Sequence, residues 1–268
     1  MKWENITSKN FKSWVDKSGG VCLLPLGVIE KHGNHLPLGT DMFSGTAVCN
    51  RAAEVETAVV FPYYFLGQIA EARHYKGTIS ASHRLIMDSL LEMCDEIHRS
   101  GFHKIIVASS HGGNSHFIPF FLQEFPGLNR QYSVYTCFTS AYTHEQREII
   151  QKTANTTDLG GHAGLTETSL MMYLHPELVH PEDQDISESA SLDRFKELDN
   201  LGVYSGFSWY AKFPYHIAGD HTLSTPELGK MLFDMQCENL VKVIRAVKAD
   251  NVSLELIKEH NMLGRRPK

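Results

Sequence analysis

Apolar runs alternate with amphipathic segments along the first half of the chain. Three runs, at 21–26, 58–65 and 104–110, have the length and composition typical of buried β-strands, and a further strand is predicted at 132–138. The stretch 41–56 lies between the first two runs and spaces its apolar residues as a helix does. Strands that alternate with helices predict an α/β fold, in which layers pack around a mainly parallel sheet.

The clearest helix is predicted over 82–101. Ser82 can cap its first turn and Gly101 can end it. A further helix is predicted after the loop at 111–114, with Asn114 as its N-cap. One face of the first helix is apolar and should pack on the sheet; it comprises Leu85, Leu90, Leu91, Cys94 and Ile97.

The pattern changes at 176–226, which is first polar, acidic and interrupted by proline, then aromatic and glycine-rich. We expect this segment to be a long excursion over the surface that serves as a lid or a subunit contact. The last helix is predicted to begin with Thr225 as N-cap and Pro226 in its first turn. Because the sequence has no repeat or linker, we expect one domain over 1–268, with 264–268 as a solvated basic tail.

Composition narrows the class of partner. A net charge of −6 and a pI near 6.2 give no electrostatic footprint for nucleic acid. No apolar stretch approaches the roughly 20 residues that a membrane span needs, and the N-terminal sequence MKWENITSKN does not resemble a secretory signal. Five widely spaced cysteines without a CxxC pair indicate a reducing environment. We therefore expect a cytoplasmic protein that acts on a small molecule, with no nucleic-acid or membrane partner.

The loop GVIEKHGNHLPLGTD at 27–41 carries the first candidate chemistry. Glu30 and His32 are two residues apart, so in extended backbone both side chains point the same way. Asp41 returns at the start of the next helix, where its two oxygens can bridge two cations. Imidazole and carboxylate together suit Zn²⁺, Mn²⁺ or Fe²⁺ rather than calcium. We expect His35 to brace the loop by a hydrogen bond to a ligand, not to bind metal itself.

Two further glycine-flanked clusters follow. His111 comes directly after a predicted strand, so its loop and the loop 27–41 meet at the same edge of the sheet. His162 and Glu167 follow in GGHAGLTETSLMMYLH. Taken singly, Glu167 is more typical of a helix-terminal acid, and His32 or His111 of a structural histidine. The hypothesis of a metal pair depends on the three clusters occurring together.

Three segments resemble the motifs of the creatininase (creatinine amidohydrolase) family. They are LPLGVIEKHGNHLPLGTD, SSHGGN and GHAGLTETSLM, and the segment GQIAEARHYKGTIS resembles the part of that family that lies beside the substrate. The resemblance implies a three-layer α/β/α fold, a homo-oligomer that is often a hexamer, and a hydrolytic centre with two divalent metal ions per chain.

The resemblance also implies a ligand set. Glu30, Asp41 and His111 would hold one ion, and His32, Asp41 and a further carboxylate the other. In members that hydrolyse creatinine, that carboxylate lies two residues after the histidine that matches His111. This chain has Gly113 there, and Glu167 is the expected replacement, with a part in catalysis as well as ligation.

A second departure concerns the substrate. Creatinine hydrolysis uses a tryptophan four residues before the histidine that matches His162, and this chain has Asp158 there. Both departures argue against creatinine. We expect His162 to shuttle the proton to the leaving nitrogen, with a pKa near neutrality. The residues expected to line the substrate side are His74, Glu71, Gly113 and Asn114.

Three functions stay open from the sequence. The first is a hydrolase of a small polar amide, open-chain or cyclic. The second is an enzyme that uses the same metal-activated water to open a keto-sugar or keto-inositol. The third is a non-catalytic metal-binding assembly protein, which predicts a missing ligand, whereas the five expected ligands are all present.

Overall fold

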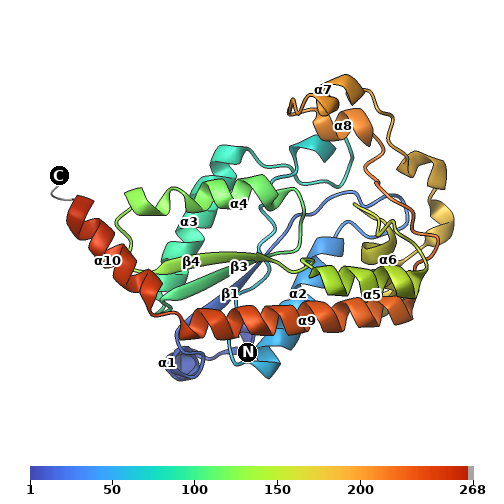
Figure 1. Cartoon of the computed structure of the whole chain (residues 1–268). Coiled ribbons are helices and arrows are strands. Elements are labelled where there is room, and N and C mark those ends of the chain that lie inside the picture. The colour runs from blue at the N-terminus through green and yellow to red at the C-terminus, as the bar shows by residue number, and fades with distance from the viewer. Residues whose placement is uncertain (265–268) are drawn as a thin grey trace.

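A four-stranded parallel sheet forms the centre of the computed structural model, which describes residues 1–264. The strands are β1 (Val21–Leu26), β2 (Val59–Val60), β3 (Lys104–Ser109) and β4 (Ser133–Phe138), in the order β2-β1-β3-β4 (Figure 1). β1 and β3 are fully buried, as expected for strands covered on both faces. The prediction of a mainly parallel sheet is confirmed.

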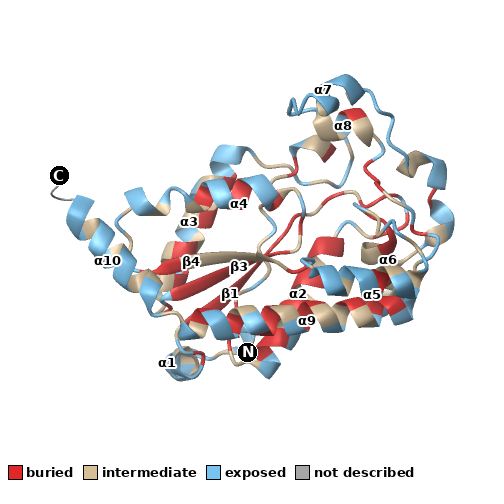
Figure 2. Cartoon of the chain, viewed as in Figure 1, coloured by how far each residue is buried: buried red, intermediate tan, exposed pale blue. Residues whose placement is uncertain are grey.

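Helices cover both faces of this sheet. On one face, α2 (Thr40–Val55) and α9 (Pro226–Ala249) enclose a core with side chains from alternate positions of β1 and β3. On α9 pack α5 (His144–Ala154) and α6 (Leu165–Leu174). Figure 2 shows the buried faces of these helices turned toward the strands.

The other face carries α3 (His83–Arg99), α4 (Asn114–Leu122) and, near the N-terminus, α1 (Ser8–Lys17). The predicted three-layer α/β/α fold is confirmed. Ser82 caps α3 as predicted, because its hydroxyl accepts a hydrogen bond from the amide of Leu85.

Three local predictions are wrong. Leu85 is 51% exposed, since the buried face of α3 is formed by Ile86, Leu90, Cys94 and Ile97. The strand predicted over 58–65 shortens to Val59–Val60, because Pro62 has no amide hydrogen to continue the ladder. Asn114 is not an N-cap: α4 begins at that residue, with Gly113 before it.

The segment predicted as an excursion consists of short elements. It holds two five-residue helices, α7 (Lys196–Asn200) and α8 (Ser208–Lys212), which stand away from the sheet in Figure 1. Thr225 then caps α9 as predicted. The 3₁₀ helices of the chain are Trp3–Asn5, Ala70–Ala72, Phe125–Gly127, Pro176–Leu178, Pro181–Asp183 and Ile186–Ser189.

An additional helix, α10 (Val252–Gly264), follows α9 and contacts β4. The solvated tail predicted at the C-terminus lies, apart from its first residue, outside the described residues. Among helices of residues 1–264, none is both long and apolar enough to cross a membrane.

Candidate metal centre

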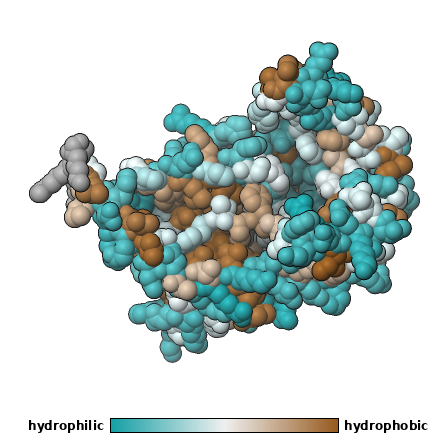
Figure 3. All heavy atoms as spheres, viewed as in Figure 1, coloured by the Kyte–Doolittle hydropathy of each residue, from teal (hydrophilic) through white to brown (hydrophobic). Residues whose placement is uncertain are grey.

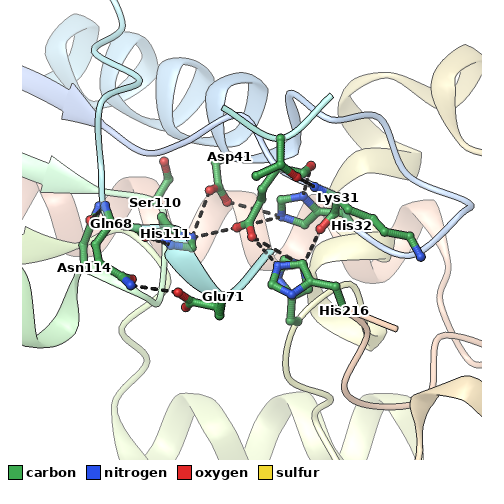
Figure 4. A network of polar contacts seen from close by, with 12 residues as sticks. Lys31, His32, Asp41, Gln68, Glu71, Ser110, His111, Asn114 and His216 are labelled. Atoms are coloured by element: carbon green, nitrogen blue, oxygen red, sulfur yellow. Dashed lines mark hydrogen bonds and ion pairs between the residues drawn. The ribbon is translucent and has the colours of Figure 1, made fainter. Parts of the chain in front are cut away.

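The centre forms at the carboxyl ends of β1 and β3, which pair in parallel up to Leu26 and Ser109. The loop after β1 supplies Glu30 and His32, and His111 follows β3 almost directly. Parallel neighbours bring their following loops together, so residues about 80 positions apart in sequence come into contact. Figure 4 shows the side chains of His32, Asp41 and His111 pointing toward one another.

α2 and α6 complete the group. Asp41 lies in the first turn of α2 and Glu167 in the first turn of α6. The carboxylate of Glu167 accepts a hydrogen bond of 2.6 Å from the amide of Ala163. The structure thus brings together all five residues predicted to bind metal.

The first group comprises Glu30, Asp41 and His111. His111 Nδ1 lies 2.8 Å from Glu30 Oε1 and 3.2 Å from Asp41 Oδ2. The other ring nitrogen, Nε2, donates to the carbonyl oxygen of Gln68 at 2.8 Å. In the neutral ring this bond leaves Nδ1 without a proton, so its lone pair points at the two carboxylates.

The second group comprises His32, Asp41 and Glu167. His32 Nε2 lies 3.5 Å from Asp41 Oδ1 and 3.9 Å from Glu167 Oε2. His32 Nδ1 donates to the backbone carbonyl of Glu30 at 3.2 Å, which leaves Nε2 as the atom with the lone pair. Asp41 therefore belongs to both groups and uses a different oxygen in each.

Three atoms at this point form no hydrogen bond although they are buried: Glu30 Oε1, His32 Nε2 and Asp41 Oδ2. Buried polar atoms without partners are rare and costly, and each needs an explanation. Here they are all acceptors that converge, with the ligand atoms of each group within 4.8 Å of one another. Divalent cations supply what such acceptors lack, so the residues fit a metal pair.

The charges of the centre shift the pKa values of the two histidines. Burial acts to lower the pKa of His32, but Asp41, Glu30 and Glu167 outweigh burial and raise it to about 9. His111 behaves in the same way: burial opposes the charged ring, and the carboxylates of Glu30 and Asp41 raise its pKa well above the ordinary value. A proton and a cation therefore compete for the ring nitrogens that face the carboxylates.

Metal affinity is accordingly expected to rise with pH. A proton on His32 must leave before a cation binds. The pKa for this proton is about 9, compared with an ordinary histidine pKa of 6.5. The apparent affinity for Mn²⁺ should increase by about tenfold per pH unit for each proton displaced between pH 6.5 and 8.5. Competition with a chromophoric chelator measures it. An affinity that stays constant over this range would contradict the assignment of His32.

His162 lies beside the centre. Its Nε2 donates to the carbonyl oxygen of Lys31 at 2.7 Å and is 3.9 Å from Glu30 Oε2. Burial, chiefly, lowers the pKa of His162 to about 3. The predicted pKa near neutrality is therefore wrong, because the ring is enclosed and has the two neighbouring histidines His32 and His216 to oppose its charge.

A cavity of about 1730 Å³ opens from the centre. Glu30, His111, His162 and Glu167 lie at its base. Its walls come from α4 and from the excursion, which contributes residues around α8, and Figure 3 shows the surface hollowed between these parts. Two residues predicted to face the substrate, Glu71 and Gly113, line this cavity.

The other two residues predicted on the substrate side do not line the cavity. Asn114 is fully buried; its amide oxygen accepts from the amide of Gln68 and its nitrogen donates to Ser109 Oγ, so it braces the loops behind His111. His74 is exposed and donates to the carbonyl oxygen of Pro214.

Gly113 has no room for a side chain. A Cβ there would lie 2.4 Å from His111 Nε2 and 2.8 Å from Gln68 Oε1, closer than real Cβ atoms come. A carboxylate at this position would displace His111 or Gln68. Glu167 instead reaches the centre from α6, with its Oε2 3.9 Å from His32 Nε2.

His35 does not bond to a metal-binding side chain. Its Nε2 lies 2.9 Å from Thr168 Oγ1, whose hydroxyl donates to the carbonyl oxygen of Ala163. The hydrogen bond of His35 therefore reaches Thr168, the residue after Glu167 on α6. The prediction of a hydrogen bond to a metal ligand is wrong, because it is Thr168 of α6 that lies beside the His35 ring.

The sequence analysis did not identify His216. This buried residue belongs to the excursion, and its Nε2 lies 2.5 Å from Glu30 Oε2. Its sequence context, FPYHIAGDH, resembles none of the acid and histidine clusters. Only the contact across the fold distinguishes it.

Comparison with known proteins places the chain in a family. A family model described as creatinine amidohydrolase matches residues 4–244. The chain belongs to the creatininase family. The predicted resemblance is thereby confirmed, and the protein is a creatininase-family hydrolase.

Three relatives show the range of the creatininase family. Creatinine amidohydrolase of Pseudomonas putida is 28% identical over 65% of this chain and 72% of its own length. The mycofactocin precursor peptide peptidase of Mycolicibacterium smegmatis is 25% identical over 85% of this chain and 83% of its own. The 3-dehydro-scyllo-inosose hydrolase of Thermotoga maritima is 22% identical over 99% of this chain and 89% of its own.

Solved creatininase structures share the fold. A manganese form has a TM-score of 0.77 at 22% identity, covering 93% of this chain and 99% of that one. A variant of the zinc–zinc type has a TM-score of 0.76 at 23% identity, covering 93% and 98%. These creatininases contain manganese or zinc, and the described residues of this chain include groups able to hold such ions.

Proposed function

We propose that this creatininase-family hydrolase binds two divalent ions per chain, Zn²⁺, Mn²⁺ or Fe²⁺, and hydrolyses a C–N bond of a small polar amide. One observation carries the proposal: two groups of potential ligands share Asp41, and three of their buried acceptor atoms have no hydrogen-bond partner. A non-catalytic assembly protein is disfavoured, because the potential ligands are complete and face a cavity.

A metal pair of this kind supplies a water activated at neutral pH and polarises the carbonyl that is attacked. The chain supplies the ligands and the proton transfer. His162 is neutral, and because its Nε2 donates to Lys31, its Nδ1 is free to accept a proton from the attacking water and return it to the leaving nitrogen. A pKa of about 3 makes the neutral ring a weak base, so accepting the proton is the costly step, whereas its return to the leaving nitrogen is favourable.

The wall of the cavity argues against creatinine as the substrate. Gly113 leaves no room for a carboxylate beside His111, and the carboxylate of Asp158 is engaged with the amide of Gly160 at 2.8 Å. An aromatic ring beside His162 comes instead from Trp209, at a centroid distance of 6.0 Å. A cavity of about 1730 Å³ also admits molecules much larger than creatinine.

A keto-sugar or keto-inositol is the second candidate substrate. The observation in its favour is coverage, since the relative that hydrolyses 3-dehydro-scyllo-inosose aligns over 99% of this chain. Ring opening would use the same activated water and the same proton acceptor. The two candidates differ in the bond cleaved, C–N or C–C, and therefore in the product.

Metal analysis and a substrate panel test the proposal. Protein purified without chelator should contain close to two equivalents of divalent metal per chain. With Mn²⁺ or Zn²⁺ it should hydrolyse a formamide or a small lactam, whereas turnover of a keto-inositol alone would establish the second candidate. Chelator-stripped protein is the control. A folded, metal-free protein with no turnover would contradict both, and rapid creatinine turnover would contradict the interpretation of Gly113 and Asp158.

The homo-oligomeric state, expected as a hexamer, the cytoplasmic location and the single-domain organisation stay predictions. The excursion supports a subunit contact, since it exposes large apolar side chains. These are Leu201, Val203, Tyr204 and Phe207.

A further inference from the structure

His216 reaches the metal centre from 186 positions away in the chain. Its Nε2 lies 2.5 Å from Glu30 Oε2, and the residue is 2% exposed. It belongs to neither group that shares Asp41, nor to the third potential metal-binding group found among residues 1–264, which joins Glu30, His32 and His162. Its contact with the centre therefore runs through Glu30.

Trp209 determines which nitrogen of His216 carries the proton. The indole Nε1–H of Trp209 lies 3.1 Å from His216 Nδ1 and can only donate. His216 Nδ1 must therefore accept, so Nε2 bears the hydrogen and donates to Glu30. Figure 4 shows His216 directed at the centre of the polar network.

The hydrogen bond from His216 to Glu30 distinguishes the two oxygens of the Glu30 carboxylate. Oε2 is occupied by His216, while Oε1 accepts no hydrogen bond and lies 2.8 Å from His111 Nδ1. The carboxylate is thus held with one oxygen free, and that oxygen is the one that lies beside His111, a member of the first ligand group.

The backbone holds His216 in an unusual conformation. Its φ of 57° lies in the left-handed region, which is costly for a residue with a side chain and tends to occur at functional sites. Hydrogen bonds from the loop 27–41 hold this conformation: Gly33 donates to the carbonyl oxygen of His216, and the Lys31 ammonium to that of Tyr215. Two residues after His216, the amide of Ala218 donates to the carbonyl oxygen of His162.

We propose that Trp209 and His216 are positioning residues that orient Glu30 for metal binding, so that the segment 208–218 of the excursion is part of the metal centre. The inference rests on the proposed function, because it presupposes the metal pair. Hydrogen-bond partners behind metal ligands typically contribute about 10–100-fold in affinity, which sets the size of the expected effect.

The test measures the affinity of the metal-free, full-length protein for Mn²⁺ by competition with a chromophoric chelator. His216→Ala should weaken binding by about 10–100-fold, and Trp209→Phe, which keeps an aromatic ring but loses the N–H, by a smaller but measurable factor of up to about tenfold. His216→Gln retains a side-chain N–H donor and should bind within a few-fold of wild type. Tyr210→Phe, in the same helix, is the matched control, because the Tyr210 ring contacts His74 and Arg194 outside the centre.

Wild-type affinity in His216→Ala would overturn the inference. So would a His216→Gln variant as weak as His216→Ala, because the ring itself would then be required. Circular dichroism and thermal unfolding of each metal-free variant establish that it folds. If His216→Ala does not fold, the other two variants decide. Unchanged Mn²⁺ affinity in Trp209→Phe overturns the inference. Weakened affinity in Trp209→Phe, with near wild-type affinity in His216→Gln, supports it. Wild-type protein that binds no Mn²⁺ is a different result: it refutes the metal centre itself.

Discussion

Replacing Asp41 with asparagine is expected to remove both metal ions and to lower kcat/KM by about 1000-fold or more. Both ligand groups contain this residue, with Oδ1 at 3.5 Å from His32 Nε2 and Oδ2 at 3.2 Å from His111 Nδ1. An amide has no negative charge and offers one acceptor in place of two, so one group loses its third ligand and the other keeps only a neutral one. Metal content per chain and steady-state kinetics measure the two effects.

The matched control for this variant is Glu54→Gln. Glu54 is an exposed acid on the same helix, α2, where it pairs with Arg51. The control should keep its metal and its activity, and both variants should keep the far-ultraviolet circular dichroism of the wild type. If Asp41→Asn retained metal and turnover, Asp41 would be a structural residue and the shared-ligand hypothesis would be wrong.

The second large effect is expected for Glu167→Gln. The metal content should fall from about two ions per chain to about one, because only the group with His32 loses a ligand. Activity should again fall by about 1000-fold or more, since a single ion would have to supply both the activation of the water and the polarisation of the carbonyl. The same metal analysis, with Glu177→Gln as an exposed-acid control, distinguishes this result from the loss of both ions in Asp41→Asn.

Stability of the metal-free variant provides an independent readout. Burial, the largest cause, raises the pKa of Glu167 to about 7 from an ordinary value of 4.5. An acid with a raised pKa destabilises the folded state progressively as pH rises from 4.5 through 7, so this cost is fully present at pH 8. Metal-free Glu167→Gln should then unfold at the same or a higher temperature than metal-free wild type. If the metal analysis found two ions still bound to Glu167→Gln, Glu167 would be an ordinary helix-terminal acid and not a metal ligand.

Much of the fold could be predicted because its signals are local. The strands at 21–26 and 104–110 are continuous apolar runs, and Ser82 and Thr225 cap their helices through contacts within one turn. The prediction that Leu85 is buried is wrong for a physical reason. The helix carries more leucines than its buried face holds, and packing against the sheet determines which of them are covered.

The roles of several polar residues could not be predicted in the same way. Asn114 has the sequence position of a cap, yet it braces Gln68 and Ser109 because the surrounding loops bury it. His162 has the expected position, but its pKa depends on its enclosure and on the histidines beside it. Burial and long-range contacts set both properties, and neither is encoded within a few residues.

The sequence by itself determined the types of the potential ligands and their local geometry: Glu30 and His32 two residues apart, Asp41 at a helix start, and His111 directly after a strand. Chain geometry over a few residues suffices for these features. Only the tertiary structure decided that Glu167 meets His32, that Gly113 has no space for a side chain, and that His216 holds Glu30. These are contacts between distant segments, and they exist only once packing has brought the segments together.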